Sequence, residues 1–209
     1  MAFSRTWLSD LSEYPDLPQG SNQLVEFNTY INNPYPVEVK GIETEWQTNL
    51  WYLPAPLSGL VLNINYTRIF SEAKYPKSVV YSVYDDEGNC TQTVIDTFYT
   101  TRLLNQPNDI LNLSLGYDYK GFSARLSMIY QDDIFKRPDF WMQNRVNSAQ
   151  LTRWDLALKQ ELPWVGIQLY IFLTNISSAK EIDVNQKTLL LANWQHYGMS
   201  GDLGLRVTF

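Results

Sequence analysis

The residues that could carry chemistry in this 209-residue chain are few and widely separated. His196 is the only histidine, and it stands beside Tyr197 and Gly198 with no cysteine or second histidine to complete a metal site. A serine, histidine and aspartate triad would need the same histidine, and no Gly-x-Ser-x-Gly motif surrounds any serine. Cys90 is the only cysteine, so it cannot form a disulfide within the chain. We expect a loop histidine, a tolerated thiol, and no catalytic, cofactor or metal site.

Two groups of acidic residues offer further chemistry. Glu43 and Glu45 alternate along one expected strand, and this spacing would let two carboxylates share a substrate, as in glycosidases. The simpler interpretation is a water-facing strand surface. The run from Asp85 to Asn89 combines oxygen ligands with a glycine but lacks the full spacing of a calcium loop. It is more typical of a polar hairpin tip.

Composition narrows the class of protein. Hydrophobic residues make up 44% of the chain and charged residues 18%, which is too apolar for disorder and too polar for a helical membrane protein. The most apolar stretch, 165–173, is interrupted by Gln168 and is too short for a membrane-spanning helix. The net charge of −6 argues against nucleic-acid binding. Aromatic residues reach 14%, which favours strands and predicts an all-β fold.

The amino-terminal residues 1–7 lack the basic region and the continuous apolar core of a secretory signal. This indicates either that the protein is not exported or that its true start lies upstream.

Alternation of apolar and polar residues with a period of two predicts an antiparallel up-and-down meander of about seven long strands. These strands are expected near 39–50, 60–67, 111–119, 122–131, 153–162, 167–174 and 203–209. One face would carry Leu60, Leu113, Leu126, Leu156, Leu169 and Leu205. The other face would carry the candidate lumen-facing residues Glu43, Glu45, Arg125, Arg153, Asp155, Lys159 and Arg206.

Strand and loop lengths favour a partial transmembrane β-barrel over a soluble sheet. A tilted strand crosses a bilayer with about 9 to 11 residues, whereas strands of soluble sheets average about five or six. Short turns at 54–56, 120–121 and 163–164 alternate with long connections at 71–109, 133–150 and 175–199. Outer-membrane barrels have such short periplasmic turns and long extracellular loops. An aromatic girdle at the membrane interface is predicted beside the short turns, from Trp51, Tyr52, Tyr117, Tyr119, Phe122 and Trp164.

The segment 195–209 resembles the closing strand of TonB-dependent receptors. Its alternating Leu203, Leu205, Val207 and Phe209 are similar to the signal by which the barrel-assembly machinery recognises its substrates. The runs 41–46, 110–117, 121–125 and 153–155 look like successive strands of the same receptors, in the same order, and 170–176 resembles their penultimate strand. Large receptors of Bacteroidetes type are the nearest comparison.

The resemblance covers the whole chain but only about the last third of the family's barrel of about 22 strands. It implies a partial outer loop at 1–36 and a carboxy-terminal barrel segment at 37–209, without the plug and the amino-terminal barrel strands. It implies a place in outer-membrane lipid, assembly by the barrel machinery, and contact with TonB only through the missing amino-terminal part. The intact receptor would take up a siderophore, a glycan or another scarce small-molecule or oligosaccharide ligand. The fragment alone would be neither an enzyme nor competent for transport.

One alternative remains open. A soluble, aromatic-rich β-sandwich could bind carbohydrate by stacking sugars on exposed Trp and Tyr rings. A hydrolase on a β-fold is a weaker third possibility, because no acid, base and nucleophile are assembled in the sequence.

Overall fold

The computed structural model describes residues 2–8, 25–31, 33–139, 141–163 and 166–208. Within these residues the regular structure is β, apart from the single-turn 3₁₀ helices η1 (Leu57–Gly59) and η2 (Met142–Asn144). The chain divides into two compact units, Met1–Val37 with Ala73–Thr101 and Glu38–Glu72 with Arg102–Phe209. No helix in the described part has the length and apolar character needed to span a membrane.

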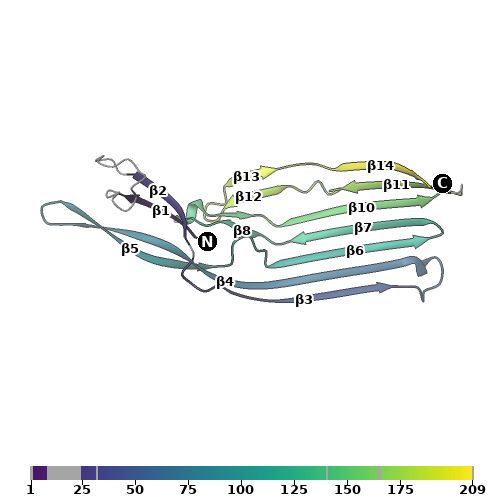
Figure 1. Cartoon of the computed structure of the whole chain (residues 1–209), viewed down its shortest axis with the longest axis horizontal. Helices are drawn as coiled ribbons and strands as arrows, with labels where there is room; N and C mark the ends of the chain where they lie inside the picture. The colour runs from purple at the N-terminus through teal and green to yellow at the C-terminus, as the bar shows by residue number, and fades with distance from the viewer. Residues whose placement is uncertain (1, 9–24, 32, 140, 164–165, 209) are drawn as a thin grey trace. The chain divides into compact units, whose positions relative to one another are not determined.

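The main sheet lies in the second unit and has the predicted meander topology (Figure 1). Its strands are β3 (Glu38–Asn49), the first part of β4 (Leu60–Tyr84), β6 (Asp109–Tyr119), β7 (Phe122–Gln131), β10 (Leu151–Glu161), β11 (Ile167–Thr174) and β14 (Ser200–Val207). They pair antiparallel in the order β3, β4, β6, β7, β10, β11, β14, so each strand lies beside its sequence neighbour within the set. The predicted strands and their order are confirmed. The sheet is open, with β3 and β14 at its edges.

The strand register assigns the side chains to faces. Residues directly opposite each other in an antiparallel pair lie on the same face. One row crosses the sheet from Leu62 through Leu115, Leu126 and Leu156 to Leu173. None of these pairings has a register shift, so all six predicted leucines lie on one face, which we call the apolar face. The other is the polar face.

The short turns and the longer connections lie at opposite ends of the strands. Figure 1 shows the turns between β3 and β4, β6 and β7, and β10 and β11 at one end, which we call the short-turn end. The longer connections from β7 to β10 and from β11 to β14 lie at the other end, the long-loop end. Lys120 and Gly121 form the tight turn between β6 and β7. Both have a positive φ, 48° and 80°, which lets the chain reverse within two residues.

The longer connections contain structure that the sequence did not predict. They hold β8 (Ile134–Arg137), β9 (Val146–Ser148), β12 (Glu181–Asn185) and β13 (Leu191–Gln195), which form a four-stranded sheet in the order β13, β12, β9, β8. Phe135 and Val146 are buried in this region. Lys136 Nζ lies 2.8 Å from the carboxylate of Asp183 and joins the two connections. β8 and β9 of the first connection therefore form one sheet with β12 and β13 of the second.

The first unit contains two strand pairs. β1 (Ala2–Leu8) pairs with β2 (Val25–Ile31) inside the segment predicted as a partial outer loop; the loop assignment itself stays a prediction. The second part of β4 pairs with β5 (Cys90–Thr101) in a long hairpin. The rings of Tyr75 and Tyr99 stack across this hairpin with centroids 5.5 Å apart.

The hairpin ends at Asp85–Asn89, which confirms the predicted polar tip. Asn89 donates to the Asp85 carboxylate from its side-chain Nδ2 at 2.9 Å and from its backbone N at 2.7 Å. These bonds, with a third from the Glu87 backbone N at 3.1 Å, hold the pKa of Asp85 below its ordinary value. The Asp85 carboxylate therefore closes the turn.

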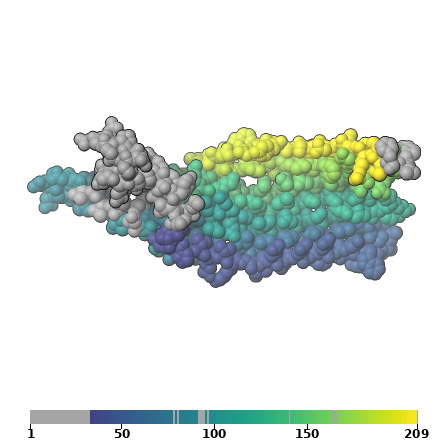
Figure 2. Space-filling view, viewed as in Figure 1, coloured from purple at the N-terminus to yellow at the C-terminus, as the bar shows by residue number. Residues whose placement is uncertain are grey.

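The strands of the main sheet lie side by side from β3, blue in Figure 2, to β14, yellow in the same view. Among the described residues the buried apolar side chains are Ala73, Tyr75, Phe135 and Val146, and all of them lie outside the seven-stranded region. Within the described residues of the second unit, the sheet thus has no second layer of the kind that normally buries an apolar face.

Candidate functional site

The apolar face has a wide band without charge. Over the seven described strands, its charged residues are Glu38, Lys40, Arg68, Glu72 and Asp109, and the register places all of them at the long-loop end. Lys40 forms an ion pair with Glu38, and Arg68 forms one with Asp109. The phenol of Tyr66 also donates to Asp109 at 2.6 Å. Every other side chain of this face, toward the short-turn end, is uncharged.

Aromatic residues lie where the band ends at the short turns. Tyr117 and Tyr119 of β6 lie on the apolar face, with ring centroids 6.2 Å apart, and Phe122 of β7 is 6.3 Å from Tyr117. In the turn from β3 to β4, the exposed rings of Trp51 and Tyr52 meet edge to face at 6.1 Å. The structure therefore gathers five of the six girdle candidates at the short-turn end. The sixth, Trp164, lies outside the described residues.

The height of the band can be estimated along β6, from Asp109 at one end to Tyr119 at the other. Ten residue steps of about 3.3 Å give about 33 Å along the strand. At the tilt of about 40° common in membrane barrels, this corresponds to about 25 Å, the height of the apolar band of outer-membrane barrels.

The polar face carries all seven candidate lumen residues, as the pairings of their strands show. Some are neutralised locally: Arg153 lies 3.3 Å from the Asp155 carboxylate, and Arg125 forms an ion pair with Asp118. Glu43 accepts a hydrogen bond from Asn65 Nδ2 at 3.0 Å. Glu43 and Glu45 lie on β3, at the edge of the sheet and away from the hollows described below. Whether this face encloses a lumen stays a prediction.

Two glycines let large side chains lie flat on the polar face. A Cβ at Gly204 of β14 would come within 2.1 Å of the Tyr170 ring, so the glycine makes room for this ring of β11. A Cβ at Gly116 would come within 2.8 Å of the guanidinium of Arg125. Placing a ring over a strand glycine covers exposed backbone and helps to fix the strand register.

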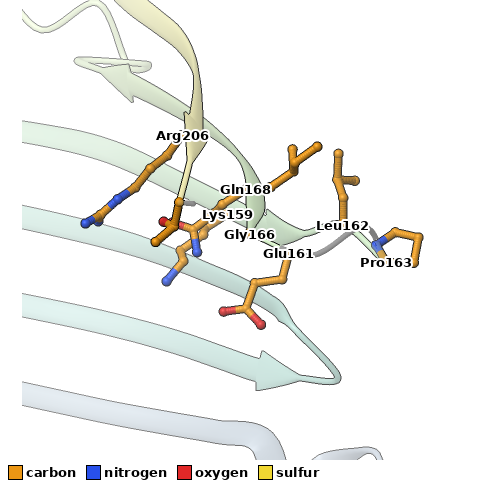
Figure 3. A pocket seen from close by; sticks show the side chains of 9 residues that line it. Lys159, Glu161, Leu162, Pro163, Gly166, Gln168 and Arg206 are labelled. Atoms are coloured by element: carbon orange, nitrogen blue, oxygen red, sulfur yellow. The ribbon is translucent and has the colours of Figure 1, made fainter.

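Two adjoining hollows lie on the polar face near the short-turn end. One has a volume of about 370 Å³ and is lined by Lys159, Glu161, Gln168 and Arg206 together with the turn after β10 (Figure 3). The other has a volume of about 330 Å³ and shares Lys159, Gln168 and Arg206 with the first. Its lining continues over Arg125 and Tyr170. Cationic side chains from three strands, β7, β10 and β14, therefore meet at these hollows.

The predicted assembly signal lies at the edge of the sheet. Leu203, Leu205 and Val207 of β14 lie on the apolar face and are exposed, opposite Ile171, Leu169 and Ile167 of β11. Phe209 lies outside the described residues.

The residues considered for chemistry remain apart. His196 lies in the connection between β13 and β14, and Cys90 is exposed at the start of β5. In the described part of the chain, no three His, Cys, Asp or Glu side chains come together in a way that could hold a metal ion.

A polar network at the long-loop end was not predicted. Asn175 is buried and has a positive φ of 56°. Its side chain donates to the Gly198 carbonyl at 2.9 Å and accepts from the Ala179 N–H at 2.8 Å, while its own N–H donates to Asp155 at 2.8 Å. The only signal in the sequence is an asparagine directly after an apolar strand, where a left-handed residue is favoured. The network anchors the last long connection to the main sheet.

Comparisons of the chain with protein-family models, with curated proteins and with solved structures found no match.

Proposed function

We propose that the chain forms the carboxy-terminal part of the wall of an outer-membrane TonB-dependent receptor. In this proposal the apolar face contacts the lipid of the bacterial outer membrane, and the polar face lines the barrel interior. The observation that carries the membrane part of the proposal is the uncharged band, about 33 Å long along β6, on an uncovered sheet face, with ion pairs at one border and aromatic rings at the other.

The free energy that would be gained by covering the exposed side chains of the apolar face supports a lipid environment. Large side chains within the band remain 38% to 74% exposed, namely Ile42, Trp46, Tyr66, Leu115, Leu203, Leu205 and Val207. Burying a large apolar side chain contributes about 1.5 to 3 kcal/mol, so covering the exposed part of each contributes about 1 kcal/mol. The sum is about 7 kcal/mol, similar to the whole stability of a typical domain. An apolar phase or a partner must cover this face.

The soluble sandwich is the weaker alternative. A sandwich would bury the leucine-bearing face beneath a second sheet about 10 Å away. Leu203 is 74% exposed and Ile42 is 65% exposed, at opposite edges of the sheet. Within the described residues of the second unit, no sheet covers this face.

The receptor assignment is supported by the resemblance of the closing strand and of the preceding strands in their order. A receptor of this kind would be assembled by the barrel machinery, and it would meet TonB through an amino-terminal part. The ligand proposed for the intact receptor is a siderophore, a glycan or another scarce molecule. No enzymatic role is proposed, because Glu43 and Glu45 lie on the edge strand β3 away from both hollows, and His196 lies in the connection between β13 and β14.

The open edges make transport by this chain alone unfavourable. The outer backbone groups of β3 and β14 have no strand partner within the described structure. Each unsatisfied backbone group in hydrocarbon costs several kcal/mol, and a barrel removes these edges only by closing. Further strands from the same protein or from other chains are therefore required.

Two measurements test the proposal. The genomic reading frame upstream of Met1 should continue in phase through further barrel strands and a plug. An in-frame stop directly upstream, with no such coding region nearby, would contradict the receptor assignment. In fractionated cells, the protein should require detergent for extraction from membranes; release by salt or alkali alone would favour the soluble sandwich.

A further inference from the structure

The hollow of about 330 Å³ on the polar face has an unusual charge balance. Three cationic side chains line it, Arg125, Lys159 and Arg206, and no carboxylate does. The neighbouring hollow includes the carboxylate of Glu161 in its lining. Figure 3 shows Lys159, Glu161 and Arg206 as side chains that line that hollow.

The register explains why these cations are close. Lys159 of β10 is opposite Tyr170 of β11, and Gln168 of β11 is opposite Arg206 of β14. Neighbouring strands lie about 4.8 Å apart, and Arg206 is two residues along β14 from the position in register with Lys159, so the two backbone positions are about 12 Å apart. Both have long, flexible side chains on the same face, and both can contact one oxyanion placed over β11.

The positive charge is only partly compensated by the protein. Arg125 is paired with Asp118. Lys159 and Arg206 form no ion pair with any residue that the structure describes, although Glu161 borders the adjoining hollow and Asp118 lies in the same cross-strand row as Lys159. Asp202 lies on the same face of β14 but lines neither hollow. Like charges held close together repel, and a bound anion relieves this repulsion.

The same hollow has an apolar wall. The rings of Tyr170 and Phe172 lie side by side with centroids 5.4 Å apart, and Phe172 is 45% exposed. Such rings pack against a flat apolar body. Gln168 and the Tyr170 hydroxyl add neutral polar groups beside the cations.

We propose that this hollow binds the oxyanion of a small molecule, a carboxylate or a phosphate, through Lys159 and Arg206, with the apolar body of that molecule against Tyr170 and Phe172. The site is built from adjacent strands of one sheet, so it does not depend on closure of a barrel or on the proposed receptor function.

The first test uses the full chain in nonionic detergent and the probes benzoate, benzamide and phenyl phosphate. Benzoate and benzamide have the same ring, but only benzoate carries a charge. Benzoate should bind saturably and shift the backbone amide signals of Gln168 and Tyr170, and benzamide should bind at least about tenfold more weakly, because a charged hydrogen bond contributes about 1.5 to 3 kcal/mol. Tighter binding of phenyl phosphate would assign the site to phosphates, and tighter binding of benzoate to carboxylates. Equal affinity for benzoate and benzamide would overturn the proposal.

Variants locate the site. Lys159→Gln and Arg206→Gln should each weaken benzoate binding by about tenfold. Lys120→Gln is the matched control, because Lys120 lies at the same end of the sheet but lines neither hollow. Equal weakening in all three variants would show an effect of net charge and would overturn the proposal. If a variant does not fold, the benzoate and benzamide comparison on the unmodified chain still decides.

Discussion

Replacing Gly204 with alanine should loosen the last strand, although alanine normally stabilises a strand position relative to glycine. The new Cβ would lie 2.1 Å from Cζ and 2.2 Å from the hydroxyl oxygen of Tyr170. The ring must then shift off β14. Overpacking of this kind costs about 1 to 3 kcal/mol, and the lower backbone entropy cost of alanine offsets about 0.5 to 1 kcal/mol. The net destabilisation of the pairing between β11 and β14 is therefore about 1 to 2 kcal/mol.

Hydrogen exchange followed by mass spectrometry measures this local effect in the full chain in detergent. A loss of about 1 to 2 kcal/mol predicts exchange about 5- to 30-fold faster in 167–174 and 200–207, with no change in β3 at the opposite edge. In a Tyr170→Ala background the same glycine substitution should be neutral or protective, because no ring opposes the new Cβ. Unchanged or slower exchange in the single variant would refute the role given to the Tyr170 and Gly204 contact.

Three further outcomes are expected. Deletion of Phe209 from the full-length parent should lower its outer-membrane yield much more than Lys187→Ala, a change in an exposed turn; equal yields would count against the assembly signal. The pKa of Asp85 is lowered by its bonds from Asn89, so these bonds stabilise the hairpin tip above the ordinary pKa of 3.8, and the stabilisation is lost as the pH falls through the lower, folded pKa. The Asn89 amide signal should titrate with a midpoint below 3.8 in the unmodified chain and not in Asp85→Asn; a midpoint above 3.8 would contradict the assignment. Cells that express only residues 1–209 should show no TonB-dependent uptake of any ligand, and such uptake would overturn the fragment proposal.

The long strands were predictable because their pattern is local. Alternation along one strand assigns its faces, and short turns such as Lys120 with Gly121 fix which strands pair. Within the row from Leu62 to Leu173, the pairs Leu115 with Leu126 and Leu156 with Leu173 follow from these two facts, because a short turn joins the strands of each pair. The charged residues Arg68 and Asp109 were not recognised as a border, because their position opposite each other depends on the register between strands about forty positions apart.

The sheet at the long-loop end was not predictable in the same way. β8, β9, β12 and β13 have three to five residues each, too few to show a clear period. β9 pairs with β12 through Ser148 and Asp183, a contact that no local pattern reveals.

The site on the polar face was only partly predictable. Alternation placed Lys159 and Arg206 on one face, but their closeness required the pairing of β10, β11 and β14. A glycine within a strand, such as Gly204 in β14, is a sequence signal for close approach, and Tyr170 is the residue that approaches it.

The proposed function requires that the apolar face contacts lipid and that the polar face contacts water. Spin labels can test it in a Cys90→Ser background, where each added cysteine is the only one. Labels would replace Leu113, Leu156 and Leu203 on the apolar face and Ser114, Ala157 and Asp202 on the polar face, in the chain associated with phospholipid bicelles. Accessibility to oxygen, which concentrates in lipid, and to a water-soluble nickel complex would then be measured by electron paramagnetic resonance. We expect high accessibility to oxygen for the three labels on the apolar face and high accessibility to the nickel complex for the three labels on the polar face. High accessibility to the nickel complex at all six positions would contradict the proposed function.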